Sequence, residues 1–568
     1  MRFGDAIVER GVPCVMRDGV TLYSDIYMPV GEGTYPVLLM RQPYGRMIAS
    51  TVSHAHPLWY ARHGYIVVIQ DVRGRGDSEG EFIPFVQEAE DGYDAVEWAA
   101  ALPRSNGRVG MYGFSYQGLT QWAAASLAPP SLKAIAPSMC PSDLYHGSFY
   151  PFGSFSIGDK LPWAFQLARD TAMRAGDTAA VELCSQTMRH PEDRLFHVPV
   201  LDKHPVLEKY FPAYYEWCEH TEYDDYWKER DWTAKFLEHP VPALHIGGWY
   251  DTYLMGTIRS FEALQSAPAK EGMLHRLIVG PWAHIPWGRK AGGVDHGPDA
   301  DGNVHLEQLR WFDYWLKDDR TADQAAEPKV KYYEQYSGEW VTADSFPSEL
   351  APGECRLYLS GSEKPAGGAL GGGRLKEAAA DIDGEAVPDV FVYDARLPMR
   401  TDSFLPVDRS PVQDRYEILV YTSRELAETL RLAGSPKVKA RVQSLAGPTD
   451  LVATLTALLP DGTARFLSVG RTDIGGATGE SSEGCEGEWE YAEITMRPVA
   501  AALAPGTRVR LELTGSAFPL FVRHPNGGEA DKHGAGEDGL KIAAVAVASD
   551  GGRPSWLELP VRRDPHIS

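Results

Sequence analysis

The chain has 568 residues, of which 43% are hydrophobic and 11% aromatic, as expected for a globular protein with more than one core. Its formal net charge of −23 argues against nucleic acid and anionic membrane as partners, because both repel an acidic surface. The six cysteines lack C-x-x-C spacing, so neither a zinc site nor a disulfide framework is predicted.

The N-terminal segment carries no apolar stretch of the signal-peptide kind. No run of about 18 apolar residues, the length of a membrane span, occurs in the chain. The default expectation is therefore a cytoplasmic protein.

Up to about residue 320, apolar strand patterns alternate with amphipathic helix patterns. Predicted strands lie at Thr21–Met28, Tyr35–Met40, Tyr65–Asp71, Arg108–Gly113, Leu132–Pro137, Pro242–Gly247 and Arg276–Gly280. Predicted helices lie at Glu88–Leu102, Tyr116–Leu127, Tyr253–Gln265 and Leu306–Asp319. Near-continuous apolar strands between helices are typical of a mainly parallel sheet covered on both faces. The predicted class is α/β, with ligands at the carboxyl ends of the strands.

Ser115 lies at a sharp turn between a predicted strand and a predicted helix, in the run Gly113-Phe-Ser-Tyr-Gln-Gly118. This arrangement is typical of the nucleophile elbow of α/β-hydrolases, in which small residues flank a strained serine. Here the second glycine follows the serine by three positions rather than two. The alternative is a serine in an ordinary glycine-rich turn.

A long segment without strand patterns follows. From about Ser142 to Trp232 the sequence shows helical patterns and aromatic clusters. An insertion of this size between two strands of a sheet predicts a helical cap above the strand ends.

A serine nucleophile needs a base and an orienting carboxylate, and in α/β-hydrolases they follow in the order serine, acid, histidine. Asp251 follows the predicted strand that ends near Ile246, and His284 follows the one that ends near Val279. Both are therefore expected at the same sheet edge as Ser115. The alternatives are a helix N-cap for Asp251 and an ordinary loop histidine for His284.

Acyl transfer also needs donors for the oxyanion of the tetrahedral intermediate. The backbone N–H of Tyr116, directly after the nucleophile, is one candidate. The second is expected in the loop after an early strand, here Arg41–Arg46, where the Tyr44 phenol could donate. A packed turn tyrosine is the alternative.

The sequence pattern changes from about Lys329, where short predicted strands alternate with turns rich in Gly, Pro and Asp. Predicted strands lie at Lys329–Glu334, Cys355–Leu359, Ile418–Thr422, Val438–Gln443 and Arg508–Thr514. This pattern favours an antiparallel sandwich of the jelly-roll kind.

Five motifs occur in order: Arg-x-Pro-Tyr44, Gln-Asp71-Val-Arg-Gly-x-x-x-Ser-Glu-Gly, Gly-x-Ser115-Tyr-x-Gly, Gly-Trp-Tyr-Asp251 and Gly-Pro-Trp-x-His284. Together they resemble the family of cocaine esterases and X-prolyl dipeptidyl peptidases, which includes glutaryl-cephalosporin acylases and α-amino acid ester hydrolases. Arg415–Ser423 and Phe518–Arg523 are similar to that family's C-terminal jelly roll, so the resemblance covers nearly the whole chain.

The resemblance implies an α/β-hydrolase core, an inserted helical cap and a C-terminal all-β jelly roll. The implied domains are residues 1–141 and 233–325 for the core, 142–232 for the cap and 326–568 for the jelly roll. It implies that Ser115 is the nucleophile, Asp251 the acid, His284 the base and Tyr44 the second oxyanion donor.

The sequence looks most similar to the cocaine esterase-like members. Phe149, Trp163 and Tyr253 occupy places where those enzymes have acyl-pocket aromatics, although ordinary cap packing also explains them. Two departures stand out. The family's usual Asp-Thr-Asp-Phe pattern appears as Thr449-Asp450-Leu451 after Gly-Pro, and no acidic cluster of the kind that binds an α-ammonium is recognisable.

The predicted function is a serine hydrolase that cleaves small-molecule esters, or amides, through an acyl-enzyme. Several alternatives stay open: an X-Pro dipeptidyl peptidase, a β-lactam or glutaryl acylase, an acyltransferase with the same triad, and a binding protein with a vestigial triad. The peptidase would need a carboxylate for the substrate's amino terminus. Neither a metal nor an organic cofactor is implied, and a homo-oligomer is left open.

Overall fold

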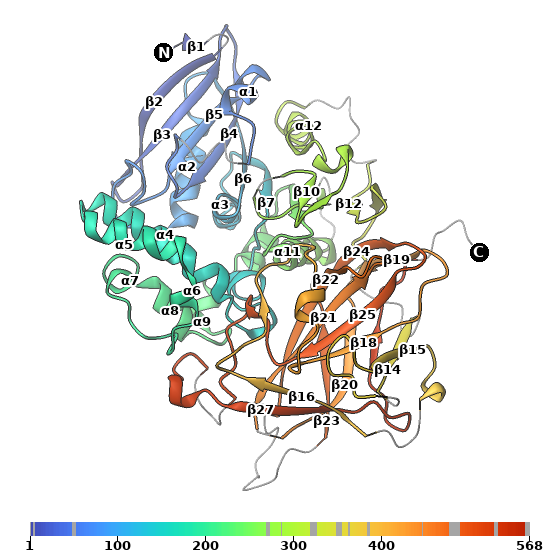
Figure 1. Ribbon diagram of the computed structural model, residues 1–568. Helices are drawn as coiled ribbons and strands as arrows, with labels where there is room; N and C mark the ends of the chain where they lie inside the picture. Colours follow the sequence, from blue (N-terminus) through green and yellow to red (C-terminus); the bar gives the residue numbers. More distant parts are fainter. Residues whose placement is uncertain are drawn as a thin grey trace.

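The computed structural model describes residues 2–3, 6–47, 53–268, 273–285, 287–318, 327–347, 355–361, 364–382, 387–445, 447–475, 489–526 and 532–562. Figure 1 shows a sheet flanked by helices in the N-terminal half (blue to green), a group of cyan and green helices beside it, and a β-rich C-terminal domain in orange and red. No helix in this described part of the chain is both long and apolar enough to cross a membrane.

The first sheet has the strand order β1-β2-β3-β5-β4-β6-β7-β8-β9-β12-β13. The strands are β1 (Arg2–Phe3), β2 (Ala6–Val15), β3 (Thr21–Pro29), β4 (Tyr35–Gln42), β5 (Ile66–Asp71), β6 (Ser105–Phe114), β7 (Leu132–Ser138), β8 (Ala243–Gly248), β9 (His275–Gly280), β12 (Val330–Glu334) and β13 (Glu339–Ala343). From β5 to β12 neighbouring strands are parallel, whereas the outer pairs are antiparallel. The seven strands predicted in this half are all present.

The central strands are mainly apolar and almost fully buried because both faces of the sheet are covered. Alternate residues of β4 enter two different cores, Val37 and Leu39 on one side and Leu38 and Met40 on the other. The first face contacts α2 (Glu88–Ala100) and α3 (Tyr116–Ala125), and the second contacts α1 (Pro57–Arg62) and α12 (Val304–Leu316). Helix α11 (Leu254–Ser266) contacts β8 and β9. This arrangement directs the loops after β6, β8 and β9 to one sheet edge.

Between β7 and β8 the chain forms helices without a strand, which is the content predicted for residues 142–232. The π-helical turn η2 (Tyr145–Phe149) and the short turn η3 (Pro151–Gly153) come first. They are followed by α4 (Ile157–Arg174), α5 (Thr178–Arg189), α6 (Glu192–Leu195), α7 (Pro205–Tyr210), α8 (Ala213–Glu219), α9 (Asp225–Lys228) and α10 (Thr233–Glu238). We refer to these helices as the cap. In Figure 1 they lie next to the C-terminal domain.

The second large sheet has the order β16-β27-β20-β28-β14-β15-β18-β25-β21-β22, with β23 paired to β20. Its strands are β14 (Arg356–Ser360), β15 (Arg374–Lys376), β16 (Asp389–Asp394), β18 (Ile418–Thr422), β20 (Lys437–Ser444), β21 (Thr449–Leu458), β22 (Ala464–Ile474), β23 (Glu490–Thr495), β25 (Arg508–Thr514), β27 (Ile542–Val547) and β28 (Trp556–Glu558). Every pair except β15–β18 is antiparallel. The predicted fold class, an α/β-hydrolase-like core with a β-rich C-terminal domain, is confirmed.

The strand predicted at Lys329–Glu334 was assigned to the wrong sheet. It forms β12, which pairs in parallel with β9 and extends the first sheet. Its sequence pattern does not reveal its partner, because a short strand near the edge of a mixed sheet and a strand of a sandwich have similar patterns. The boundary predicted between residues 325 and 326 lies outside the described residues, so the domain limits remain a prediction.

Candidate active site

Ser115 occupies a strained turn at the end of β6. Its backbone angles are φ 57° and ψ −127°, in the left-handed half of φ space that non-glycine residues rarely adopt. A Cβ on Gly113 would lie 2.5 Å from the Gln117 Cβ, and one on Gly118 would lie 2.3 Å from the Cys140 sulfur. These contacts explain why glycines stand two residues before and three residues after the serine. The turn is a nucleophile elbow in geometry as well as in sequence.

Asp251 and His284 come together from the loops after β8 and β9. The His284 Nδ1 lies 2.7 Å from Oδ1 of Asp251, whose side chain is fully buried. His284 lines the same cavity as Ser115. Within the described residues no hydrogen bond joins the Ser115 hydroxyl to the imidazole, as is common before a substrate tightens such contacts.

The Tyr44 phenol lines this cavity and is available as a donor. Its oxygen accepts a hydrogen bond from Nε1 of Trp163 at 3.2 Å, which leaves its own proton for another acceptor. Burial raises the pKa of Tyr44 to about 12, so the phenol stays neutral at physiological pH. The loop is fixed two residues later, where the Arg46 backbone N–H donates to Asp71 Oδ1 at 2.6 Å. Asp71 is thus a structural residue.

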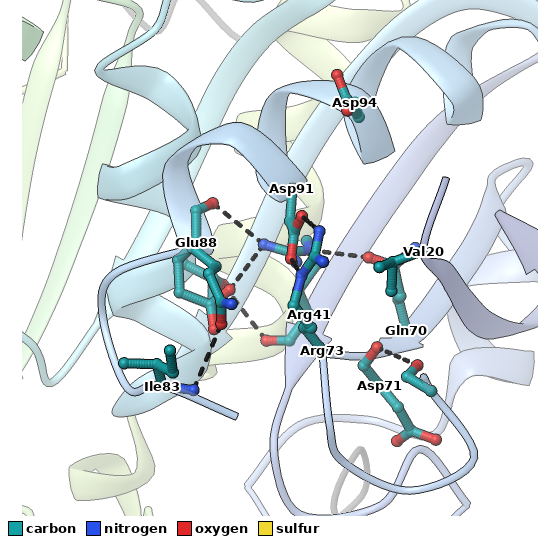
Figure 2. Close-up of polar contacts among 12 residues, drawn as sticks. Val20, Arg41, Gln70, Asp71, Arg73, Ile83, Glu88, Asp91 and Asp94 are labelled. Carbon is teal, nitrogen blue, oxygen red and sulfur yellow. Dashed lines mark hydrogen bonds and ion pairs between the residues drawn. The ribbon is translucent and has the colours of Figure 1, made fainter. Parts of the chain in front are cut away.

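A buried ion-pair network supports the elements that carry the two candidate oxyanion donors (Figure 2). Arg41, near the end of β4, donates to Oε2 of Glu88 and to Oε1 of Gln70, both at 2.8 Å. The other Glu88 oxygen accepts the Tyr116 phenol proton at 2.9 Å. Burial raises the pKa of Glu88, and the charge of Arg41 opposes that change. Since β4 leads into the Tyr44 loop and Tyr116 begins α3, the network links the two donors.

The cavity has a volume of about 510 Å³, and its walls come from the core and the cap. The three aromatics predicted for the acyl pocket, Phe149, Trp163 and Tyr253, all line it. The Tyr253 ring lies edge-on to His284, with centroids 5.1 Å apart. Phe85 lines it as well and stacks on Tyr116 at 5.3 Å.

One charged pair in this cavity was not predicted from the sequence. Asp159 and Lys160 begin α4, and Nζ of Lys160 donates to Asp159 Oδ2 at 2.7 Å and to Ser148 Oγ at 2.8 Å. The Tyr253 phenol also donates to Asp159, at 2.9 Å. Burial lowers the pKa of Lys160. Burial alone would raise the pKa of Asp159, but the charge and hydrogen bond of Lys160, together with His284 and the Tyr253 phenol, lower it. The 2.7 Å contact makes Asp159 and Lys160 a locally neutral pair.

The sequence held a signal for this pair. Lys160 shares a helical face with the buried residues Ala164, Leu167 and Ala168, at spacings of four, seven and eight. A lysine on an apolar helix face requires a buried partner. Asp159 is a carboxylate in the cavity wall of the kind that a peptidase would need for the substrate's amino terminus, and sequence reasoning did not locate it.

One group of side chains elsewhere has donor atoms close enough for a metal: Asp450, Asp473 and His524. Arg471 and Lys532 already neutralise its two carboxylates, because Nη2 of Arg471 lies 2.6 Å from Asp450 and contacts Asp473, and Lys532 also contacts Asp473. His524 Nδ1 accepts the backbone N–H of Asn526 at 3.0 Å. The side chains that could ligate a metal are thus already bound to protein groups.

Comparisons with known proteins agree with this geometry. A model of the X-Pro dipeptidyl-peptidase (S15) family matches residues 18–286, and one of the X-Pro dipeptidyl-peptidase C-terminal non-catalytic domain matches residues 323–558. The cocaine esterase of Rhodococcus sp. (strain MB1 Bresler) is 30% identical over 557 residues, which cover 92% of this chain and 93% of that relative. An aminopeptidase from the marine sediment archaeon Thaumarchaeota archaeon and an α-amino acid ester hydrolase each superpose with a TM-score of 0.78 at 23% identity, over 98% of this chain and 97% of theirs.

The parallel sheet and the strained serine define an α/β-hydrolase with a β-rich C-terminal domain. The chain belongs to the X-Pro dipeptidyl-peptidase (S15) family, since the resemblance to the cocaine esterase runs along nearly its whole length. It is a serine hydrolase, as the sequence predicted.

Proposed function

We propose that the chain hydrolyses small-molecule carboxylic esters through an acyl-enzyme on Ser115. The observation that carries the proposal is the 2.7 Å contact between Asp251 and His284, which lines the cavity of the strained serine. Asp251 would hold the imidazole in the tautomer that presents Nε2 to the cavity and would stabilise its protonated form.

In the proposed reaction, the Ser115 Oγ attacks the ester carbonyl carbon while His284 takes its proton. The carbonyl π electrons move to the oxygen, which becomes an oxyanion bound by the Tyr116 backbone N–H and the Tyr44 phenol. When the C–O bond breaks, His284 returns the proton to the departing alcohol. Water then attacks the acyl-enzyme by the same route and releases the acid.

Two features favour esters over X-Pro peptides. The cavity walls are largely apolar and include seven Phe, Tyr and Trp side chains, which suits an apolar acyl group. Asp159, the carboxylate available to a substrate ammonium, is already neutralised by Lys160 at 2.7 Å. The name of the Rhodococcus relative, cocaine esterase, also supports ester cleavage.

A substrate panel tests the proposal. We expect p-nitrophenyl butyrate and benzoate to be hydrolysed with a kcat/KM at least about tenfold above that of Gly-Pro-p-nitroanilide, because the described residues of the pocket offer no unpaired negative charge to the dipeptide amine. Initial rates at 405 nm measure both leaving groups in one assay, with Ser115→Ala as the background control. A higher kcat/KM for the anilide would replace the esterase assignment with an exopeptidase.

The pH dependence of kcat/KM should follow His284 on the acid side. Only a neutral imidazole accepts the serine proton, so kcat/KM is expected to be lower at acidic than at neutral pH. It should then stay level to pH 10, because the raised pKa of Tyr44, about 12, keeps the phenol protonated. Rates with an ester whose leaving group does not titrate in this range check the profile. A profile that does not fall at acidic pH would count against His284 as the base.

A further inference from the structure

The catalytic-acid loop, Trp249–Asp251, contains an unbalanced buried charge. Oδ1 of Asp251 faces His284, but Oδ2 is buried and has no hydrogen-bond partner among the described residues. A buried carboxylate oxygen without a donor is costly unless a positive charge lies near it. The stabilising charge must therefore come from outside the triad.

Arg497 reaches this loop from the C-terminal domain. It lies between β23 and β24 (Val499–Leu503), is 2% exposed, and donates from Nη2 to the backbone oxygens of Trp249, at 3.1 Å, and of Asp251. Its own backbone N–H donates to the Val469 carbonyl at 2.9 Å, and its guanidinium lies 4.0 Å from the Phe404 ring centroid. Arg497 is thus fixed both at its backbone and at its guanidinium.

The charge of Arg497 has no carboxylate contact of its own. Within the described part of the chain no acidic side chain forms an ion pair with it, unlike the buried Arg409, which pairs with Glu512 at 2.7 Å. Burial lowers the pKa of Arg497, and the charge of Asp251 is the one that opposes this change. The two buried charges therefore act on each other through space.

We propose that Arg497 is a positioning residue of the active site, fixing the backbone of the acid loop and contributing a buried positive charge close to Asp251. Lys160 of α4 is a second buried cation that acts on Asp251 through space. The inference rests on the proposed function of Asp251 and His284. The inference gives the C-terminal domain a role in catalysis. Through Arg497 this domain supports the acid loop on the side away from the cavity, without contacting the substrate.

The test compares Arg497→Gln, which keeps an amide donor but removes the charge, with Arg497→Lys, which keeps the charge. For Arg497→Gln we expect kcat to fall by about 10²-fold with KM within about threefold, since a displaced acid loop misaligns His284. Loss of the positive charge makes protonation of the Asp251–His284 pair easier. The acid limb of the kcat/KM profile should therefore move up by about one pH unit, while Arg497→Lys keeps it in place.

Arg471→Met is the matched control, because Arg471 is also a buried arginine of the C-terminal domain and contacts the cap through the Phe152 carbonyl at 2.9 Å. It should lower the thermal midpoint but leave the acid limb unchanged. Equal acid limbs in Arg497→Gln and Arg497→Lys, or an equal shift in Arg471→Met, would overturn the inference. If Arg497→Gln does not fold, Arg497→Lys alone decides. A shifted acid limb of its kcat/KM profile would overturn the inference, and an unshifted acid limb with a lowered kcat would support it. Failure of a fluorophosphonate to label wild-type Ser115 would instead refute the proposed function, and the inference with it.

Discussion

Ser115→Ala is expected to lower kcat for ester hydrolysis by about six orders of magnitude, the loss that removal of a triad serine causes in serine proteases. The reason is specific to the turn: the φ of 57° presents Ser115 to the cavity at the start of α3, whereas the Ser148 hydroxyl in the same cavity is already bound by Lys160. KM should change little, because the cavity walls remain. Ester hydrolysis in the presence of excess variant measures the loss.

Covalent labelling provides the complementary measurement. A fluorophosphonate should modify wild-type Ser115 and fail to modify the alanine variant, as read by peptide mass spectrometry. Ser126→Ala is the matched control, since this buried serine lies at the other end of α3 and only bonds the Ala123 carbonyl at 2.7 Å. It should be labelled at the wild-type rate. Labelling that persists in Ser115→Ala would assign the nucleophile to another residue.

Tyr44→Phe is expected to lower kcat by two to three orders of magnitude, about 3–4 kcal/mol of transition-state stabilisation. The phenol oxygen already accepts the Trp163 indole N–H, so the proton that the substitution removes is the one available to the oxyanion. Ground-state binding should change less than the rate, because the developing charge appears only in the transition state. Steady-state kinetics with an ester substrate separate kcat from KM.

Tyr60→Phe is the control for the loss of a buried phenol. Tyr60 is fully buried on the other face of the sheet and donates to Gln308 at 3.2 Å. Its removal should cost about 1 kcal/mol of stability and leave kcat within twofold. A twofold effect of Tyr44→Phe, equal to this control, would remove Tyr44 from the mechanism and leave the oxyanion to backbone donors.

The sequence predicted those parts of the site that local rules determine. The elbow at Ser115 follows from two glycines that the turn cannot replace, and the loops of Asp251 and His284 follow from strands that end before them. Chain order then placed the three residues at one sheet edge. Their catalytic roles remain the proposal that the substitutions above test.

The residues that sequence reasoning missed owe their roles to contacts across long separations. Arg497 meets the acid loop 246 residues away, and no local pattern marks it among the arginines of a strand-rich segment. Lys160 lies close to the predicted pocket aromatics, but its partners Ser148 and Tyr253 come from different elements. The strand at Val330–Glu334 joined the first sheet for the same reason, since its partner β9 is set by tertiary packing.

One helix of the cap, α4, contacts two phenols of the site, the one proposed to bind the oxyanion and the one beside the proposed base. Trp163 of α4 holds the Tyr44 oxygen, while Lys160 and Asp159 of the same helix hold the Tyr253 phenol beside His284. Any substitution that tilts α4 to admit a bulkier acyl chain will also shift the Tyr44 phenol, the group proposed to bind the oxyanion. Breadth of substrate and speed of turnover are therefore coupled in this scaffold, and directed evolution toward larger esters should favour exchanges at Phe149 or Ile285, which lie off that helix.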